Sequence, residues 1–179
     1  MKSQLNFLES GFYKTITIVL LITLSAHSCE KEKSEPTLPP ETKEGKNSFG
    51  CYINDKLFRW QRGSAGFANP SLAANYKKST QSLVISASSR TGSVRLRVLN
   101  PGVRKIIPQS VEYTTGRYTY EAQNTGEIFF TRFDLNNRII SGTFACEIQI
   151  YDDDGNVKET IKFTQGRFDI KMRDYNIRD

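Results

Sequence analysis

The side chains that most often perform catalysis are scarce in this chain of 179 residues. Its single histidine is His27, which lies in an apolar N-terminal segment. Nucleophile activation in Ser-His-Asp and Cys-His arrangements needs an imidazole, as do histidine zinc sites and facial-triad iron sites. We therefore exclude histidine-based chemistry after residue 28, and we expect a protein that is not an enzyme and carries no cofactor.

Carboxylates are the groups left for acid–base chemistry. Glycoside hydrolysis needs two of them about 5 to 10 Å apart in a cleft. Most acids of this chain fall in turns or on the polar sides of strands, where solvated surface charge explains them. The candidates by default are Glu112, Glu121, Glu127, Asp134 and Asp169. A carboxylate-dependent, glycan-active enzyme is accordingly a minor alternative.

Residues 152–156 read Asp-Asp-Asp-Gly-Asn, an oxygen-rich run. Calcium takes several carboxylate and carbonyl ligands, but this run lacks the spacing of an EF-hand loop and its closing glutamate. A polar hairpin turn explains the segment. We therefore predict no metal site.

Cys51 and Cys146 each alternate with apolar residues, so both should point into a core. An even pair of cysteines permits a disulfide in an oxidising compartment. Two buried free thiols are the alternative, since cysteine packs well as a small apolar residue. The sequence leaves both open, because it does not show whether the two strands are neighbours.

Arg95 and Arg97 are the candidate site for an anionic ligand. They alternate with Val94, Leu96 and Val98, so both project from the polar side of one strand. The chain has a net charge of +6, and acidic polysaccharides or lipid head groups are the targets that such a stripe would attract. A solvated face is the alternative. Aromatic side chains that could stack on sugars, or simply pack a core, are Trp60, Tyr113, Tyr118 and Tyr120.

The elements that position these residues are predicted to be β-strands. Apolar residues after residue 47 recur with a period of two, typical of half-buried strands. About nine strands are predicted, at 49–53, 57–61, 81–87, 94–98, 117–122, 127–133, 143–150, 160–164 and 168–172. Only residues 69–75 could hold a helical turn.

Turn-forming residues separate these runs, at 54–55, 100–102, 124–126, 136–137 and 152–156. Short connections favour antiparallel neighbours. Stacking or closing such a sheet hides its edges. The predicted fold class is therefore all-β, an antiparallel β-sandwich or partly closed barrel.

The N-terminus predicts export. Lys14 precedes the apolar run 16–24, and Ala26-His27-Ser28 leads into Cys29, which is the order of a signal peptide over residues 1–28. The run is well short of the roughly 20 apolar residues of a transmembrane helix. The segment resembles the lipobox of bacterial lipoproteins, which implies that Cys29 becomes the acylated first residue.

Residues 29–46 are rich in charge and proline and contain one large apolar residue, Leu38. Such a composition cannot offset its ordering entropy, so we predict a disordered, semi-stiff tether. The charged run after Cys29 resembles the export tag of Bacteroidetes lipoproteins. A single all-β domain is predicted over residues 47–179.

Three segments of this domain, 49–56, 139–144 and 163–169, resemble an uncharacterised family of Bacteroidetes lipoproteins. The signatures are Ser-Gly-Thr-Phe at 141–144 and Gly-x-Phe-Asp at 166–169. This resemblance implies a lineage and a location in the envelope, and it implies no activity.

Together these features predict a lipoprotein attached to the outer membrane by an N-terminal lipid anchor at Cys29, on the cell surface. We expect a non-catalytic binding or structural β domain whose partner is a glycan or a protein and not a nucleic acid. A small barrel that holds an apolar ligand, as in lipocalins, is the alternative. The sequence does not indicate the oligomeric state.

Overall fold

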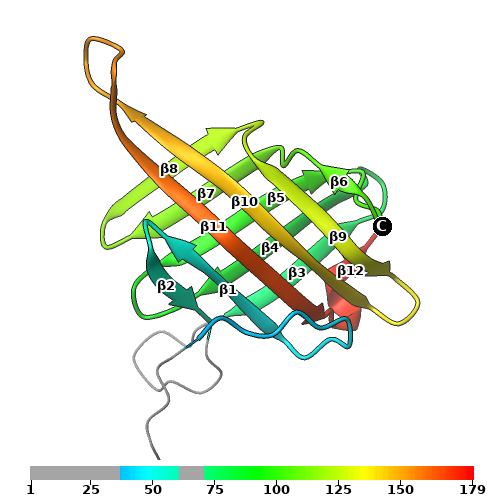
Figure 1. The fold of residues 1–179 in the computed structure, drawn as a ribbon. Helices are drawn as coiled ribbons and strands as arrows, with labels where there is room; N and C mark the ends of the chain where they lie inside the picture. The colour runs from blue at the N-terminus through cyan, green and yellow to red at the C-terminus, as the bar shows by residue number, and fades with distance from the viewer. Residues whose placement is uncertain (1–36, 61–70) are drawn as a thin grey trace, which may run out of the picture. The chain divides into compact units, whose positions relative to one another are not determined.

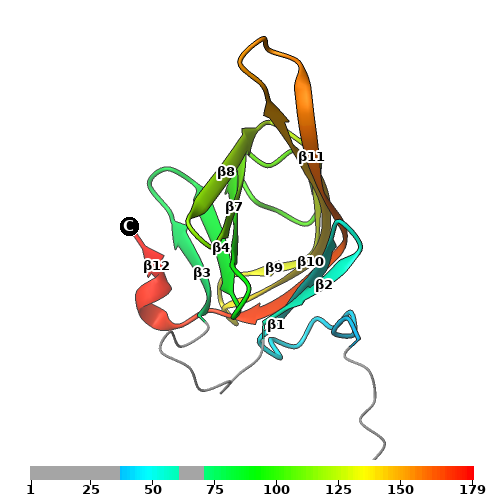
Figure 2. The same cartoon turned by 90° about the vertical axis from the view of Figure 1, so that its left-hand side faces the viewer.

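Apolar residues alternate along most strands of this protein, so each of these strands has one buried side. The strands form two sheets that pack face to face through these buried sides (Figures 1 and 2). The computed structural model describes residues 37–60 and 71–179. The first sheet contains, in spatial order, β2 (Lys56–Arg59), β1 (Ser48–Ile53), β11 (Val157–Lys171), β10 (Ile139–Tyr151), β9 (Glu127–Asp134) and β6 (Lys105–Ile106).

The second sheet contains β12 (Ile177–Arg178), β3 (Leu72–Lys77), β4 (Ser82–Ser88), β5 (Ser93–Leu99), β7 (Ser110–Thr115) and β8 (Tyr118–Gln123). A short 3-10 helix, η1 (Asp174–Asn176), precedes β12. Strand pairs are antiparallel except for β12 and β3. The sheets do not close into a barrel, so the predicted β-sandwich is confirmed.

Side chains of the two sheets pack against each other in the core. Tyr113 of the second sheet packs edge-on against Phe163 of the first, with ring centroids 5.8 Å apart. Tyr76 and Phe133 make a second contact between the sheets at 5.5 Å.

The strand assignments differ from the prediction in several places. β6, β7 and β12 lie outside the predicted runs, and two further differences have a clear physical cause. The run proposed to hold a helical turn, 69–75, overlaps β3, whose Ala and Asn residues carry little strand propensity and are ordered by pairing with β4. The predicted strands 160–164 and 168–172 are one strand, β11. A β-bulge at Gln165 and Gly166 interrupts its alternation, which concealed the continuity.

Residues 37–46 form a strap, a segment without regular secondary structure that lies on the outer face of the first sheet (blue in Figure 1). The sequence predicted a disordered tether over residues 29–46, whereas the structure shows residues 42–46 hydrogen-bonded to the sheet. Pro39 is buried, and a Cβ on Gly50 of β1 would lie 2.7 Å from its Cδ atom. The composition of the strap gave no sign that a binding surface for it exists elsewhere in the chain.

β10 and β11 continue as a two-stranded arm past the ends of their neighbours, as Figure 1 shows. β9 pairs with β10 only as far as Ala145, and β1 pairs with β11 only as far as Phe163. All residues from 151 to 159 are exposed. The arm therefore lacks the packing that stabilises the rest of the sheet.

Candidate functional site

Arg95 and Arg97 do share the outer face of the second sheet. The Nη1 atom of Arg95 donates to both carboxylate oxygens of Glu112, at 2.9 and 3.0 Å. Glu121 lies directly across from Glu112 on β8. Two carboxylates therefore balance the two guanidinium groups, and the predicted basic stripe carries little net charge.

The cysteines lie on strands that are not neighbours. β11 separates β1, which carries Cys51, from β10, which carries Cys146. Two inter-strand spacings come to about 9.5 Å, more than a disulfide can span. Both cysteines are buried free thiols. Burial raises the pKa of Cys146 to about 12 and that of Cys51 further, so neither supplies a reactive thiolate.

The acidic run 152–156 is the hairpin turn at the tip of the arm. Oδ1 of Asp152 accepts hydrogen bonds from the backbone N–H groups of Asp154 and Asn156, at 3.0 and 2.8 Å. Within the described parts of the chain, no group of three His, Cys, Asp or Glu side chains could hold a metal ion.

The candidate sugar-stacking aromatics divide between the core and the surface. Tyr113 and Tyr120 pack against the core. Tyr118 is 67% exposed and stacks on Tyr120. Both residues lie on β8, the last strand of the second sheet, and Tyr113 of β7 lies directly across from Tyr120.

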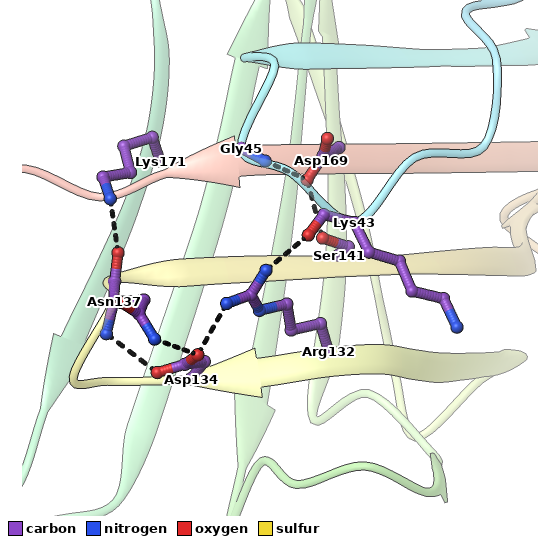
Figure 3. A network of polar contacts seen from close by, with 8 residues as sticks. All are labelled: Lys43, Gly45, Arg132, Asp134, Asn137, Ser141, Asp169 and Lys171. Carbon is purple, nitrogen blue, oxygen red and sulfur yellow. Dashed lines mark hydrogen bonds and ion pairs between the residues drawn. The ribbon is translucent and has the colours of Figure 1, made fainter.

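Asp169 is the buried polar centre of the outer face of the first sheet. Its side chain is 1% exposed, although alternation along β11 directs it away from the core (Figure 3). Ser141 on β10, its direct cross-strand partner, donates its hydroxyl to Oδ1 at 2.6 Å. The remaining acceptor positions are used by the strap.

The strap gives Asp169 four more hydrogen bonds. The Thr42 hydroxyl donates at 2.5 Å, and the backbone N–H groups of Glu44, Gly45 and Lys46 donate at 3.1, 2.8 and 3.0 Å. Burial alone raises the pKa of Asp169, but these hydrogen bonds outweigh it and leave the pKa below its ordinary value. A charged carboxylate thus clamps the strap onto the sheet.

Neighbouring polar groups extend this clamp (Figure 3). Arg132 of β9 donates to the backbone carbonyl of Lys43 at 2.7 Å and to Asp134 at 2.7 Å. The hydrogen bond from Arg132 and those from Asn137 lower the pKa of Asp134. Asp134 is therefore held as an anion by structural partners.

The two sequence signatures are one cross-strand unit. Ser141 lies opposite Asp169, and Phe144 lies opposite Gly166. A Cβ on Gly166 would come within 2.5 Å of the Phe144 ring, so the ring needs a glycine beneath it. Gly166 and Phe144 therefore pack against each other, while Ser141 and Asp169 form the hydrogen-bonded centre to which the strap binds.

An open groove lies beside the strap, over the bulge of β11. Its volume is about 280 Å³, and it is lined by Glu41, Glu127, Phe129, Thr143, Phe144, Ala145, Gln165, Gly166 and Arg167. Phe129 and Thr143 are direct cross-strand partners on the outer face. The sequence singles out Glu127 as a carboxylate and places Thr143, Phe144, Gly166 and Arg167 in the two signatures, but it does not bring them together as a groove. The signal for the groove was Phe129, an apolar residue at a polar position of its strand.

Among the described residues, no helix has the length and apolar character needed to cross a bilayer. Cys29 and the predicted signal peptide lie outside the described residues. No protein-family model matches the chain, and no curated protein or solved structure is detectably similar to it.

Proposed function

We propose that this protein is a lipid-anchored lipoprotein of the outer membrane, and that its β-sandwich is a non-catalytic binding domain on the cell surface. The motif ending at Cys29 supports the anchor. The partner is a glycan or a protein, and no nucleic acid is involved.

The observation that carries the proposal is the clamp between the strap and Asp169. A domain on a free tether samples every orientation, whereas a docked strap fixes the point at which the chain leaves the sandwich. Seven residues separate Cys29 from Thr37, and these span at most about 28 Å. An anchor at Cys29 would therefore keep the sandwich near the lipid surface in a restricted range of orientations.

Lipid labelling tests the anchor. The full chain is expressed in a Bacteroidetes host that is fed an alkyne-bearing fatty acid. We expect the wild type to carry the label and to sediment with membranes. Cys29→Ser should lose both properties, whereas Cys51→Ser, the matched control, should keep them. Membrane association of unlabelled Cys29→Ser would refute the lipid anchor.

Protease treatment of intact cells tests the side of the membrane. The wild type should be digested. Replacing residues 30–33 with alanine should leave the label in place and protect the domain, if these residues form an export tag. Protection of the wild type would contradict surface exposure.

A further inference from the structure

We propose that the groove over the β11 bulge binds one or two sugar rings of a neutral polysaccharide, with Phe129 as the stacking platform and Gln165 as a hydrogen-bonding residue. This inference deepens the proposed function and rests on it. The site lies on the outer face of the first sheet, where the strap forms one wall through Glu41.

Phe129 supplies an exposed aromatic face. Its neighbours along β9, Ile128 and Phe130, are fully buried, while Phe129 is 44% exposed. An outward ring beside hydroxyl and amide groups suits a ligand with one apolar face and a polar rim. A pyranose ring has this character. The hydroxyl of Thr143, opposite Phe129, provides a donor and an acceptor beside the ring.

Charges around the groove favour a neutral ligand. Glu41 pairs with Nε of Arg167 at 3.3 Å, and Glu127 pairs with Lys105 at 2.5 Å. Two acids and two bases cancel, so an anion or a cation would gain little net attraction. The paired side chains can still accept from and donate to sugar hydroxyls.

Gln165 adopts a backbone conformation that favours glycine. Its φ is +51°, in the left-handed region, which is strained for a residue with a Cβ. The bulge turns this exposed residue toward the groove. Bulges often redirect a side chain next to a functional site. The strained glutamine is accounted for if its amide binds the ligand.

The size of the groove indicates a chain ligand. At about 280 Å³ it lies just below the range of about 300 to 1,000 Å³ in which drug-sized molecules are enclosed. Because the groove is open, it can hold a short stretch of a polymer that continues past it on both sides.

Saturation-transfer NMR tests the site directly. The full chain is purified in a detergent without a sugar head group, its aromatic protons are irradiated, and transfer to added oligosaccharides is recorded. The probes are maltohexaose, chitohexaose and mannohexaose, with hexagalacturonate as the acidic comparison. We expect transfer to at least one neutral probe and little to hexagalacturonate.

Three variants locate the binding. Phe129→Ala and Gln165→Gly should each weaken binding of the neutral probe about tenfold, the effect of losing one strong contact. Gln165→Gly should do so without lowering the urea midpoint, since glycine relieves the strain. Gln81→Gly is the matched control: Gln81 is also an exposed glutamine with positive φ, but it lies in the turn between β3 and β4. The Gln81→Gly variant should bind the neutral probe as tightly as the wild type does.

Several results would overturn the proposal. These are absence of transfer to every neutral probe, preference for hexagalacturonate, or binding that survives both groove variants. None of these results affects the lipid labelling of Cys29. The NMR experiment can therefore refute the sugar site while the proposal of a lipid anchor stands, and the labelling experiment can do the reverse.

Discussion

The outer faces of the two sheets differ in what covers them. On the first sheet the strap buries outward positions, so that Ser141 and Asp169 are as inaccessible as core residues. On the second sheet the outward positions carry hydroxyls and the half-exposed pair of Arg95 and Glu112. A buried carboxylate at a solvent-side position thus marks where another segment of chain must lie, because burying it without donors would be costly.

Charge has a different effect on the two faces. On the covered face one carboxylate receives five hydrogen bonds away from water. On the bare face the ion pair between Arg95 and Glu112 is in contact with solvent, which weakens it. Replacing a carboxylate by its amide should therefore lower the free energy of unfolding much more at Asp169 than at Glu112.

Asp169→Asn should have the largest effect. The amide keeps one acceptor but turns a donor toward groups that also donate, so we expect a loss of about 3 kcal/mol in the free energy of unfolding at pH 7. Urea denaturation of the full chain measures it. A loss below about 1 kcal/mol would mean that the carboxylate does not hold the strap.

Acid should weaken the clamp in a predictable direction. The folded-state pKa of Asp169 is below its ordinary value, so its contribution to stability is full above the unfolded pKa of about 3.9. It is lost as the pH falls from there through the folded pKa. Urea midpoints between pH 7 and pH 3 should fall less in Asp169→Asn than in the wild type. If the urea midpoints of the wild type and of Asp169→Asn fell equally with pH, Asp169 would not be the group whose protonation weakens the clamp.

Gly50→Ala should displace the strap by crowding Pro39. We expect a loss of about 1 to 2 kcal/mol and faster hydrogen exchange at the backbone N–H groups of Gly45 and Lys46. Gly102→Ala is the control, because nothing lies within 4 Å of its Cβ position. Equal effects of the two variants would show that the strap does not press on Gly50.

Glu112→Gln, on the bare face, should have the smallest effect. The exposed pair with Arg95 contributes only about 0.5 kcal/mol, and part of that is retained by a neutral hydrogen bond. Urea denaturation in low and high salt should show almost no change. A loss comparable to that of Asp169→Asn would remove the distinction between the two faces.

Much of the fold was predictable because it depends on local periodicity. The alternation in 94–98 placed β5, and the Asn54-Asp55 turn, in which both residues have positive φ, joined β1 to β2. β3 was missed because its stability comes from its neighbours and not from its own residues. β11 was divided in two because one extra residue at the bulge reverses its alternation.

The candidate site was mostly beyond prediction because it depends on contacts distant in sequence. Thr42 and Asp169 lie 127 residues apart and meet only through the sheet. Asp169 was noted as a carboxylate and interpreted as surface charge, since nothing local shows that a strap covers it. Pairing of Ser141 with Asp169 required the register of β10 and β11, which two short signatures do not specify.

The projecting arm bears on how molecules of this protein avoid aggregating. A two-stranded ribbon exposes backbone donors and acceptors along both edges, and here Tyr151 and Val157 add exposed apolar surface. The three successive aspartates at its tip, residues 152–154, give every copy of the ribbon the same dense negative charge. Repulsion between like tips opposes edge-to-edge pairing, and because salt screens this repulsion, we expect pairing of the ribbons to increase with ionic strength.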